Sequence, residues 1–242
     1  GNRAEARQKP PYPGTNGLWN RQTLLNNVET LANIPLILTM GAAEYRKTGT
    51  EKNPGTKLVT LSGCVQRPGV YEIPLGMPVQ EIYEKLGGGT PEGKRLFAVQ
   101  TGGASGPFLL ADKLNTPFDI ESCRDAGVTL GVGDLMFIGE DADALSLAAT
   151  LVHFFANESC GRCVPCRYGL PKLEKLLNAV AQGEADQETL GEIEDTANYI
   201  RLNARCALGT AAVTPVLSLL KSCRALFEQR LNQNTWETGR VV

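Results

Sequence analysis

Four of the seven cysteines in this 242-residue chain fall in a spacing that constrains the fold more than any other feature. Cys160, Cys163 and Cys166 form a C-x2-C-x2-C run, and Cys206 follows forty residues later. A loop with this spacing can present three thiolates to one face of an iron–sulfur cubane, and a remote cysteine can complete the ligand set. The chain is therefore expected to fold so that residue 206 returns to the 160–166 loop.

Other cysteine chemistries fit this spacing less well. A structural zinc site also binds four thiolates, but zinc modules usually show two separated pairs rather than three plus one. A disulfide framework fits an odd number of cysteines poorly, and a thioredoxin-like C-x-x-C motif lacks its βαβ context here. The spacing favours an iron–sulfur cluster in a reducing compartment, with zinc as the alternative. The other three cysteines are interpreted as buried small side chains: Cys64, Cys123 and Cys223.

The residues around the cysteine run suit an anionic cluster. Gly161 permits a tight bend, and Pro165 holds the loop open before the next helix. The start of that helix directs backbone N–H groups and a positive dipole end toward the site, and Arg162 and Arg167 add positive charge. His153, the only histidine, is interpreted as a packed residue rather than a ligand.

Composition narrows the function classes. With 24 basic and 26 acidic side chains the net charge is -2, which argues against nucleic-acid binding. No window holds about 18 to 20 consecutive apolar residues, so no direct membrane insertion is expected. The polar start does not read as a signal peptide.

The pattern along the chain predicts an α+β protein with three regions followed by a tail. Residues 1–55 open with a Pro-rich strap and continue as a helix over 23–47, with Thr23 as its N-cap and a kink or restart at Pro35. Residues 56–140 alternate short strands with one helix over Val79–Leu86. The expected strands are Lys57–Leu61, Gly69–Ile73, Leu96–Thr101 and Asp134–Ile138.

Residues 141–232 show four apolar-periodic segments with short connections, typical of a helical bundle. These segments lie near 142–158, 167–182, 187–204 and 212–231, and residues 233–242 are expected to form a tail.

Two weaker signals remain. Asn26, Asn27 and Thr30 stand at a helix start, with Asn26 and Thr30 on one face, and carboxamides of this kind suit a flavin ring or its phosphate. Taken alone, they would more often be caps and surface groups. The glycine-rich segment 100–107 is interpreted as a structural turn, because it lacks the spacing of a dinucleotide fingerprint.

Several motifs together closely resemble one family, the flavin-bearing, NADH-oxidising subunit of respiratory complex I and the diaphorase subunits of NAD-linked hydrogenases and formate dehydrogenases. The resemblance covers nearly the whole chain in the family's order. The matching segments are Pro10-Pro11-Tyr12-Pro13, Asn26 to Leu31, Ser62 to Val65, Pro68 to Glu72, Glu158 to Arg167 and Cys206 to Gly209.

The resemblance implies a ubiquitin-like β-grasp domain of the soluble-ligand-binding (SLBB) type at 56–140, then a four-helix bundle holding a [4Fe–4S] cluster. It implies Cys160, Cys163, Cys166 and Cys206 as cluster ligands and Asn26, Asn27 and Thr30 as FMN contacts, with no catalytic residue in this chain. Its chemistry would be hydride transfer from NADH to FMN, with electrons passing through the cluster to a thioredoxin-like [2Fe–2S] subunit and a further iron–sulfur subunit.

One departure from the family is clear. Its members begin with a large α/β domain carrying a glycine-rich motif for FMN and NADH, and no such motif is found here. The chain is therefore expected to be either a fragment or the partner of a separate flavin domain, and by itself unable to oxidise NADH. A cytoplasmic or matrix-side location, peripheral on a membrane complex, is expected. The competing classes are a zinc-binding assembly subunit without redox activity and a ligand-binding module built on the β-grasp domain.

Overall fold

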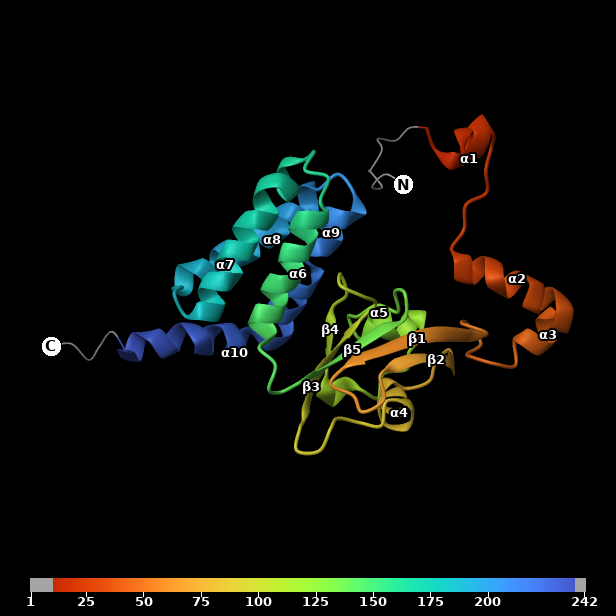
Figure 1. The fold of residues 1–242 in the computed structure, drawn as a ribbon, viewed down its shortest axis with the longest axis horizontal. Helices are drawn as coiled ribbons and strands as arrows, with labels where there is room; N and C mark the ends of the chain where they lie inside the picture. The colour runs from red at the N-terminus through yellow and green to blue at the C-terminus, as the bar shows by residue number, and fades with distance from the viewer. Residues whose placement is uncertain (1–10, 238–242) are drawn as a thin grey trace. The chain divides into compact units, whose positions relative to one another are not determined.

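A computed structural model of the chain describes residues 11–237, with side chains as far as Leu231. It divides into two compact units, Gly1–Gly55 and Thr56–Val242. Figure 1 traces both in chain order. The portion of the expected strap before residue 11 lies outside the described residues.

From residue 11 onward, the first unit contains four short helical elements: α1 (Pro13–Asn16), the 3-10 turn η1 (Leu18–Asn20), α2 (Val28–Met40) and α3 (Ala42–Tyr45). The expected helix start at Thr23 is wrong. Asn27 is the N-cap, because its side chain accepts a hydrogen bond from the backbone N–H of Glu29 at 2.8 Å. Thr23 instead stabilises a turn by accepting from Leu18 and donating to the carbonyl of Arg21.

A restart of the helix at Pro35, one of the two expectations for this residue, is wrong. Pro35 lies inside α2, which continues to Met40 and ends at Gly41 in a left-handed conformation (φ 87°) that a glycine adopts without steric cost.

The second unit opens with a five-stranded sheet in the order β2-β1-β5-β3-β4. Its strands are β1 (Thr56–Gly63), β2 (Gly69–Pro74), β3 (Leu96–Thr101), β4 (Phe108–Leu110) and β5 (Asp134–Gly139). The pair β1–β5 is parallel, and the other neighbours are antiparallel. The four expected strands are confirmed. β4 was not expected, since three residues are too few to show alternation.

Helices accompany this sheet. The expected helix over Val79–Leu86 is confirmed as α4 (Val79–Glu81) followed by the π-helical turn η2 (Ile82–Leu86). The 3-10 turn η3 (Ala111–Lys113) and α5 (Ile120–Asp125) were not expected. Asp119 caps α5 by accepting from the backbone N–H of Ser122.

β3 and β5 are mostly buried and pack on both sides, since neighbouring strand residues point to opposite faces, whereas β1 and β2 leave side chains such as Leu58 and Val70 exposed. Val99 and Phe137 belong to the core between the sheet and the helices that accompany it. In this core, the ring of Tyr83 stacks on that of Phe137, with 5.2 Å between the centroids. The adjacent residues Ala98 and Ile138 belong to the core of the C-terminal bundle. The sheet and the bundle are therefore packed together.

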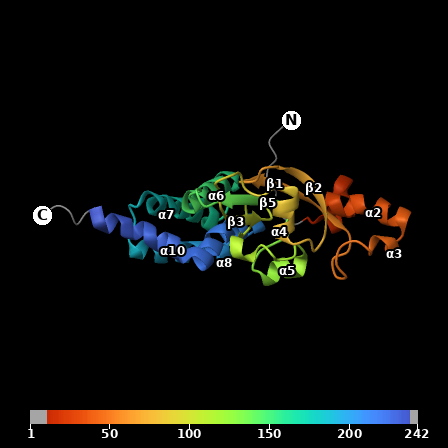
Figure 2. The same cartoon turned by 90° about the horizontal axis from the view of Figure 1, so that it is seen from below.

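The bundle contains five α-helices: α6 (Ala144–Glu158), α7 (Leu170–Gln182), α8 (Gln187–Asn203), α9 (Ala207–Ala212) and α10 (Thr214–Glu237). Four match the expected segments, and the short α9 is additional. A π-helical turn, η4 (Pro165–Gly169), leads into α7. α10 contacts α6, α7, α8 and also β4. Figure 2 shows α10 running beside α7 and α8. The tail expected from residue 233 is wrong as far as Glu237, where α10 ends, and residues 238–242 lie outside the described region.

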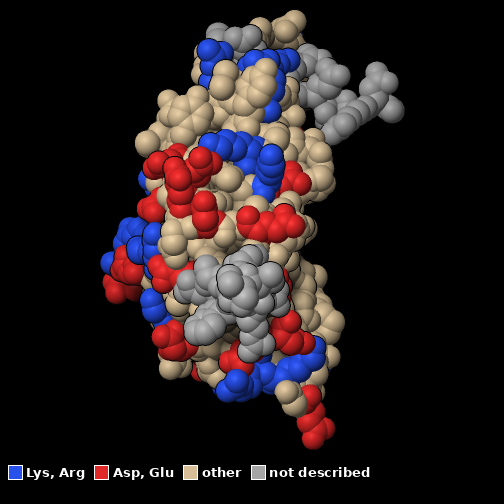
Figure 3. Space-filling view, turned by 90° about the vertical axis from the view of Figure 1, so that its left-hand side faces the viewer, with Lys and Arg blue, Asp and Glu red and all other residues tan. Residues whose placement is uncertain are grey.

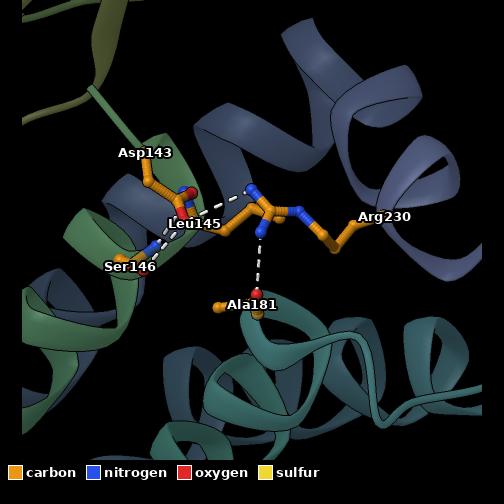
Figure 4. A network of polar contacts seen from close by, with 5 residues as sticks. All are labelled: Asp143, Leu145, Ser146, Ala181 and Arg230. Carbon is orange, nitrogen blue, oxygen red and sulfur yellow. Dashed lines mark hydrogen bonds and ion pairs between the residues drawn. The ribbon is translucent and has the colours of Figure 1, made fainter. Parts of the chain in front are cut away.

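One polar network ties three bundle helices together at the end remote from the cysteine loop (Figure 4). Arg230 of α10 donates to the carbonyl of Ala181 on α7 and pairs with Asp143, the N-cap of α6. Partial burial alone would raise the pKa of Asp143. Hydrogen bonds from Ser146 and Leu145, together with the charge of Arg230, outweigh burial and hold that pKa below its ordinary value.

No helix in the described region of the chain is long and apolar enough to cross a bilayer. On the face drawn in Figure 3, basic side chains lie close to acidic ones.

Candidate metal centre

Three of the expected ligands lie in the connection between α6 and α7. This connection begins at Ser159, whose hydroxyl accepts a hydrogen bond from the backbone N–H of Gly161 at 3.1 Å. Gly161 has φ 67°, which favours glycine, and it turns the chain between Cys160 and Cys163. Cys166 follows in η4, where Pro165 occupies a first-turn position that needs no N–H donor.

The fourth expected ligand lies between α8 and α9. Cys206 is the N-cap residue of α9 and has an extended backbone (φ -149°). It is held there because Ala204 still donates its N–H to Ile200 of α8 and Thr210 donates back to the carbonyl of Cys206. A residue forty positions from the loop is thus fixed between two helices.

Contacts between the two segments bring three of the four cysteines together. The backbone N–H of Arg205 hydrogen-bonds the Cys163 thiol, and the thiols of Cys163 and Cys206 both act electrostatically on Cys166. Gly209 leaves the space that the Cys166 sulfur occupies, because a Cβ at Gly209 would lie 2.8 Å from that sulfur. Sequence reasoning did not find the roles of Arg205 and Gly209, although both flank Cys206.

The thiol environments differ within this group. Two backbone hydrogen bonds lower the pKa of Cys163. The one from Arg205 has the larger effect, and the one from Cys166 follows. Burial raises the pKa of Cys166 to about 11, and the negative charges of Cys163 and Cys206 act in the same direction, while a hydrogen bond from Ser159 opposes them. Thiolates gathered here repel one another until a cationic centre balances their charge.

Cys160 is exposed, and within residues 11–231 no hydrogen bond joins its thiol to the other three. Among the described side chains, no three His, Cys, Asp or Glu groups are placed around a single metal ion. Of the remaining cysteines, only Cys123 is fully buried as expected, with its pKa raised to about 11 by burial. Cys64 and Cys223 are half-buried.

The interpretation of His153 as a packed side chain is wrong. It is exposed on α6, where Nδ1 lies 2.9 Å from Glu174 of α7 and Nε2 lies 2.9 Å from Asn157. Neither ring nitrogen is left to ligate a metal.

The arrangement of donors fits an iron–sulfur cluster. Sulfur is the ligand that such clusters take from proteins, and N–H groups directed at the sulfurs, like that of Arg205, tune their potential. The start of η4 brings positive charge near the loop, but Arg167 lies over the ring of Tyr168 at 5.0 Å. That all four cysteines together ligate one cluster remains a prediction.

The expected flavin contacts lie in the first unit. Asn27 caps α2, Asn26 precedes the cap and Thr30 is in the first turn, and all three side chains are exposed. Because α2 begins at Val28, Asn26 is not helical, and the argument that it shares a helical face with Thr30 fails.

Two family models match this chain, and they define its class. Residues 146–230 match the NADH-ubiquinone oxidoreductase-F iron-sulfur binding region, and residues 58–109 match the SLBB domain. The first match runs from α6 into α10 and includes all four cysteines, and the second runs from β1 into β4. This is the class of proteins that joins an SLBB domain to an iron–sulfur-binding helical region.

Similarity extends over nearly the whole chain. The F subunit of NADH-quinone oxidoreductase from Escherichia coli K12 is 40% identical over 234 residues, which are 96% of this chain and 53% of that protein. The NADP-reducing hydrogenase subunit HndC of Solidesulfovibrio fructosivorans is 35% identical over 96% of this chain and 47% of its own length. A crystal structure of an NAD+-reducing [NiFe]-hydrogenase superposes with a TM-score of 0.82 at 34% identity, covering 94% of this chain and 38% of that chain.

The chain belongs to the family of NADH-quinone oxidoreductase F subunits and related hydrogenase subunits, as the sequence motifs predicted. It spans about half the length of the curated relatives it matches.

Proposed function

We propose that this chain is the electron-transfer portion of an NADH:acceptor oxidoreductase, holding a [4Fe–4S] cluster through Cys160, Cys163, Cys166 and Cys206. The observation that carries the proposal is the return of Cys206 to the 160–166 loop, within the residues that match the iron-sulfur binding region. In the complete enzyme, FMN would accept hydride from NADH and the cluster would carry single electrons onward.

The protein's own contribution is placement and protection. η4 and α9 hold the cysteine segments at one end of the bundle, and Gly209 leaves room for the sulfur of Cys166. The burial of Cys166, 4% exposed, keeps water from one side of the site. The Arg205 N–H stabilises negative charge on the sulfur of Cys163.

The first unit is the region proposed to meet a flavin-bearing domain, in the same or a separate chain. α2 has no buried residue, and the side chains of Val28 and Leu38 are 80% and 79% exposed. Such apolar exposure marks a surface that another domain covers. Asn26, Asn27 and Thr30 would contact FMN at that surface, where the α2 N-terminus favours a phosphate.

The proposed partners are a thioredoxin-like [2Fe–2S] subunit and a further iron–sulfur subunit of a redox complex. The named relatives are subunits of NADH-quinone oxidoreductase and hydrogenase, and their names support multi-subunit assembly. We propose a location on the cytoplasmic or matrix side, peripheral on a membrane complex.

Metal content tests the cluster. The chain purified without oxygen is expected to hold about four irons, as a [4Fe–4S] cluster requires, whereas about one zinc without iron would establish the zinc alternative.

Cys206→Ser is expected to lose most of the iron, because a hydroxyl is a weaker ligand and the link between the loop and α9 is lost. Cys223→Ser, on α10 outside the cysteine site, is the matched control. Undiminished iron in Cys206→Ser contradicts the ligand assignment.

Flavin occupancy of the assembled enzyme tests the first unit. Asn27→Ala is expected to lower FMN content while iron stays constant. Since this change also removes the α2 cap, Asn27→Ser is the necessary companion, because serine caps a helix about as well but lacks the carboxamide. FMN loss in both variants supports a direct contact. Full occupancy in Asn27→Ser assigns Asn27 to capping alone.

A further inference from the structure

A cavity of about 260 Å³ lies where the sheet meets the bundle. One wall is formed by β4 and its preceding residues, with Pro107, Phe108 and Leu109 buried behind it. The other wall is one face of α10, which presents Thr214, Ser218, Lys221 and Ser222 in addition to Leu217. Neither the cysteine site nor the expected flavin contacts share a residue with this cavity.

The charged lining of the cavity carries one sign only. Lys113 follows β4, Lys221 lies on α10 and Arg201 lies near the end of α8, so three elements each supply one cation. No acidic residue lines the cavity, and among the described side chains neither lysine has an ion-pair partner. Arg201 donates one hydrogen bond to the side-chain oxygen of Asn198, and its guanidinium has further N–H donors. Asp112, beside Lys113, is not in the lining, and its charge acts on Cys223.

Hydroxyl groups line the same space. The Oγ of Ser218 accepts a hydrogen bond from the backbone N–H of Phe108 at 3.0 Å, which ties α10 to β4 and fixes this hydroxyl at the wall. Within the described residues, its proton has no acceptor, and neither Thr214 nor Ser222 has a hydrogen-bond partner through its side chain. A hydroxyl can donate to an anion without adding charge of its own.

We propose that this cavity binds a small anionic molecule bearing a phosphate or carboxylate group, held by Lys113, Lys221 and Arg201. An anion is the ligand chemistry that three cations and unpaired hydroxyls select, because charge-assisted hydrogen bonds are the strongest of these contacts. The apolar wall at Phe108 and Leu109 receives the uncharged portion of the molecule. The volume is just below the roughly 300–1,000 Å³ of typical ligand pockets, so the ligand is small.

The site shares no residue with the cysteine site or the expected flavin contacts, and it joins the sheet to the bundle. Occupancy would add a bridge between β4 and α10 beyond the Ser218 hydrogen bond. A ligand that binds only the folded state also stabilises it in proportion to its concentration over its Kd.

Calorimetric titration of the full chain tests the proposal, using inorganic phosphate in one arm and succinate in the other at fixed ionic strength. Saturable binding of at least one probe is expected, and the arm that binds identifies the group. Lys113→Ala and Lys221→Ala are each expected to weaken binding about tenfold, as the loss of one charge-assisted contact implies. Lys221→Arg is expected to retain the affinity for the probe, since the positive charge is kept.

Lys175→Ala is the matched control, because Lys175 is an exposed lysine on α7 that does not line the cavity. Its affinity for the probe is expected to equal that of the parent chain. Absence of binding in both arms overturns the proposal. So does an equal loss of affinity in Lys175→Ala and Lys221→Ala, which would reduce the effect to net charge.

Discussion

The two units of this chain treat their apolar side chains in opposite ways. In the second unit, one core lies between the sheet and its helices and the other fills the bundle and its contact with β3 and β5, and large side chains such as Phe137 and Phe227 are fully buried. In the first unit, no hydrophobic side chain of the described residues is buried, and Leu24 and Leu38 are 86% and 79% exposed. The two regions therefore differ in how much apolar surface they bury.

This difference shows which region of the chain folds on its own contacts. Most helical stability in proteins comes from packing one apolar face, so α6 to α10 are stabilised by one another. α2 is capped by Asn27 and ended by Gly41, yet its apolar residues contact little within the chain. The second unit therefore supports the cysteine site with packed cores, whereas α2 in the first unit has no buried residue.

The largest expected effect tests this contrast directly. Phe227→Ala on α10 is expected to lower the free energy of unfolding by about 3–5 kcal/mol, because it opens a cavity in the bundle core. Leu38→Ala on α2 is expected to change it by less than about 0.5 kcal/mol in this chain. Urea denaturation followed by circular dichroism measures both. A cost of several kcal/mol for Leu38→Ala would show that the first unit has a core of its own.

A glycine pair sharpens the contrast within the bundle. Gly209→Ala is expected to cost about 1–3 kcal/mol, because the new methyl group would lie 2.5 Å from the Cβ of Ala204 and 2.8 Å from the Cys166 sulfur. Gly191→Ala on α8, where nothing lies within 4 Å, is expected to stabilise by about 0.5–1 kcal/mol through helix propensity. Thermal unfolding of the two variants measures both changes in stability. Equal effects would refute tight packing around Cys166.

The two N-caps give the smallest expected difference. Asp143→Asn keeps a capping oxygen on α6 but removes the charge paired with Arg230, and a loss of about 0.5–1 kcal/mol is expected near pH 7. Since the folded state lowers the pKa of Asp143, its charge stabilises the fold above the ordinary carboxyl pKa, and that contribution is lost as the pH falls through the lowered value.

The difference between parent and Asp143→Asn is therefore expected to shrink below about pH 4. Asn27→Ala on α2 serves as the uncharged comparison, because an amide does not titrate and its capping contribution has no such pH dependence. Stability curves measured from pH 3 to 7 check this. A constant Asp143→Asn difference across that range would contradict the role of the charge.

Much of the second unit could be predicted from sequence, because its patterns are long and periodic. Four strands and five helices were expected where they occur, and the cysteine spacing predicted that residue 206 returns to the loop. Short elements such as β4 and α9 were not predicted, since three to six residues are too few to show a period. The start of α2 was misplaced because Thr23 and Asn27 are both good caps, and only their hydrogen bonds distinguish them.

The sequence by itself determined the fold class, the family and the residues available as cluster ligands, because these depend on residue type and spacing. Tertiary structure alone decided that the Arg205 N–H meets Cys163, that Gly209 makes room for Cys166, and that Lys113, Arg201 and Lys221 line one cavity. These groups come from segments far apart in the chain, and no local pattern encodes their proximity. Packing among the bundle helices creates the first two contacts, and packing of the sheet against the bundle creates the cavity.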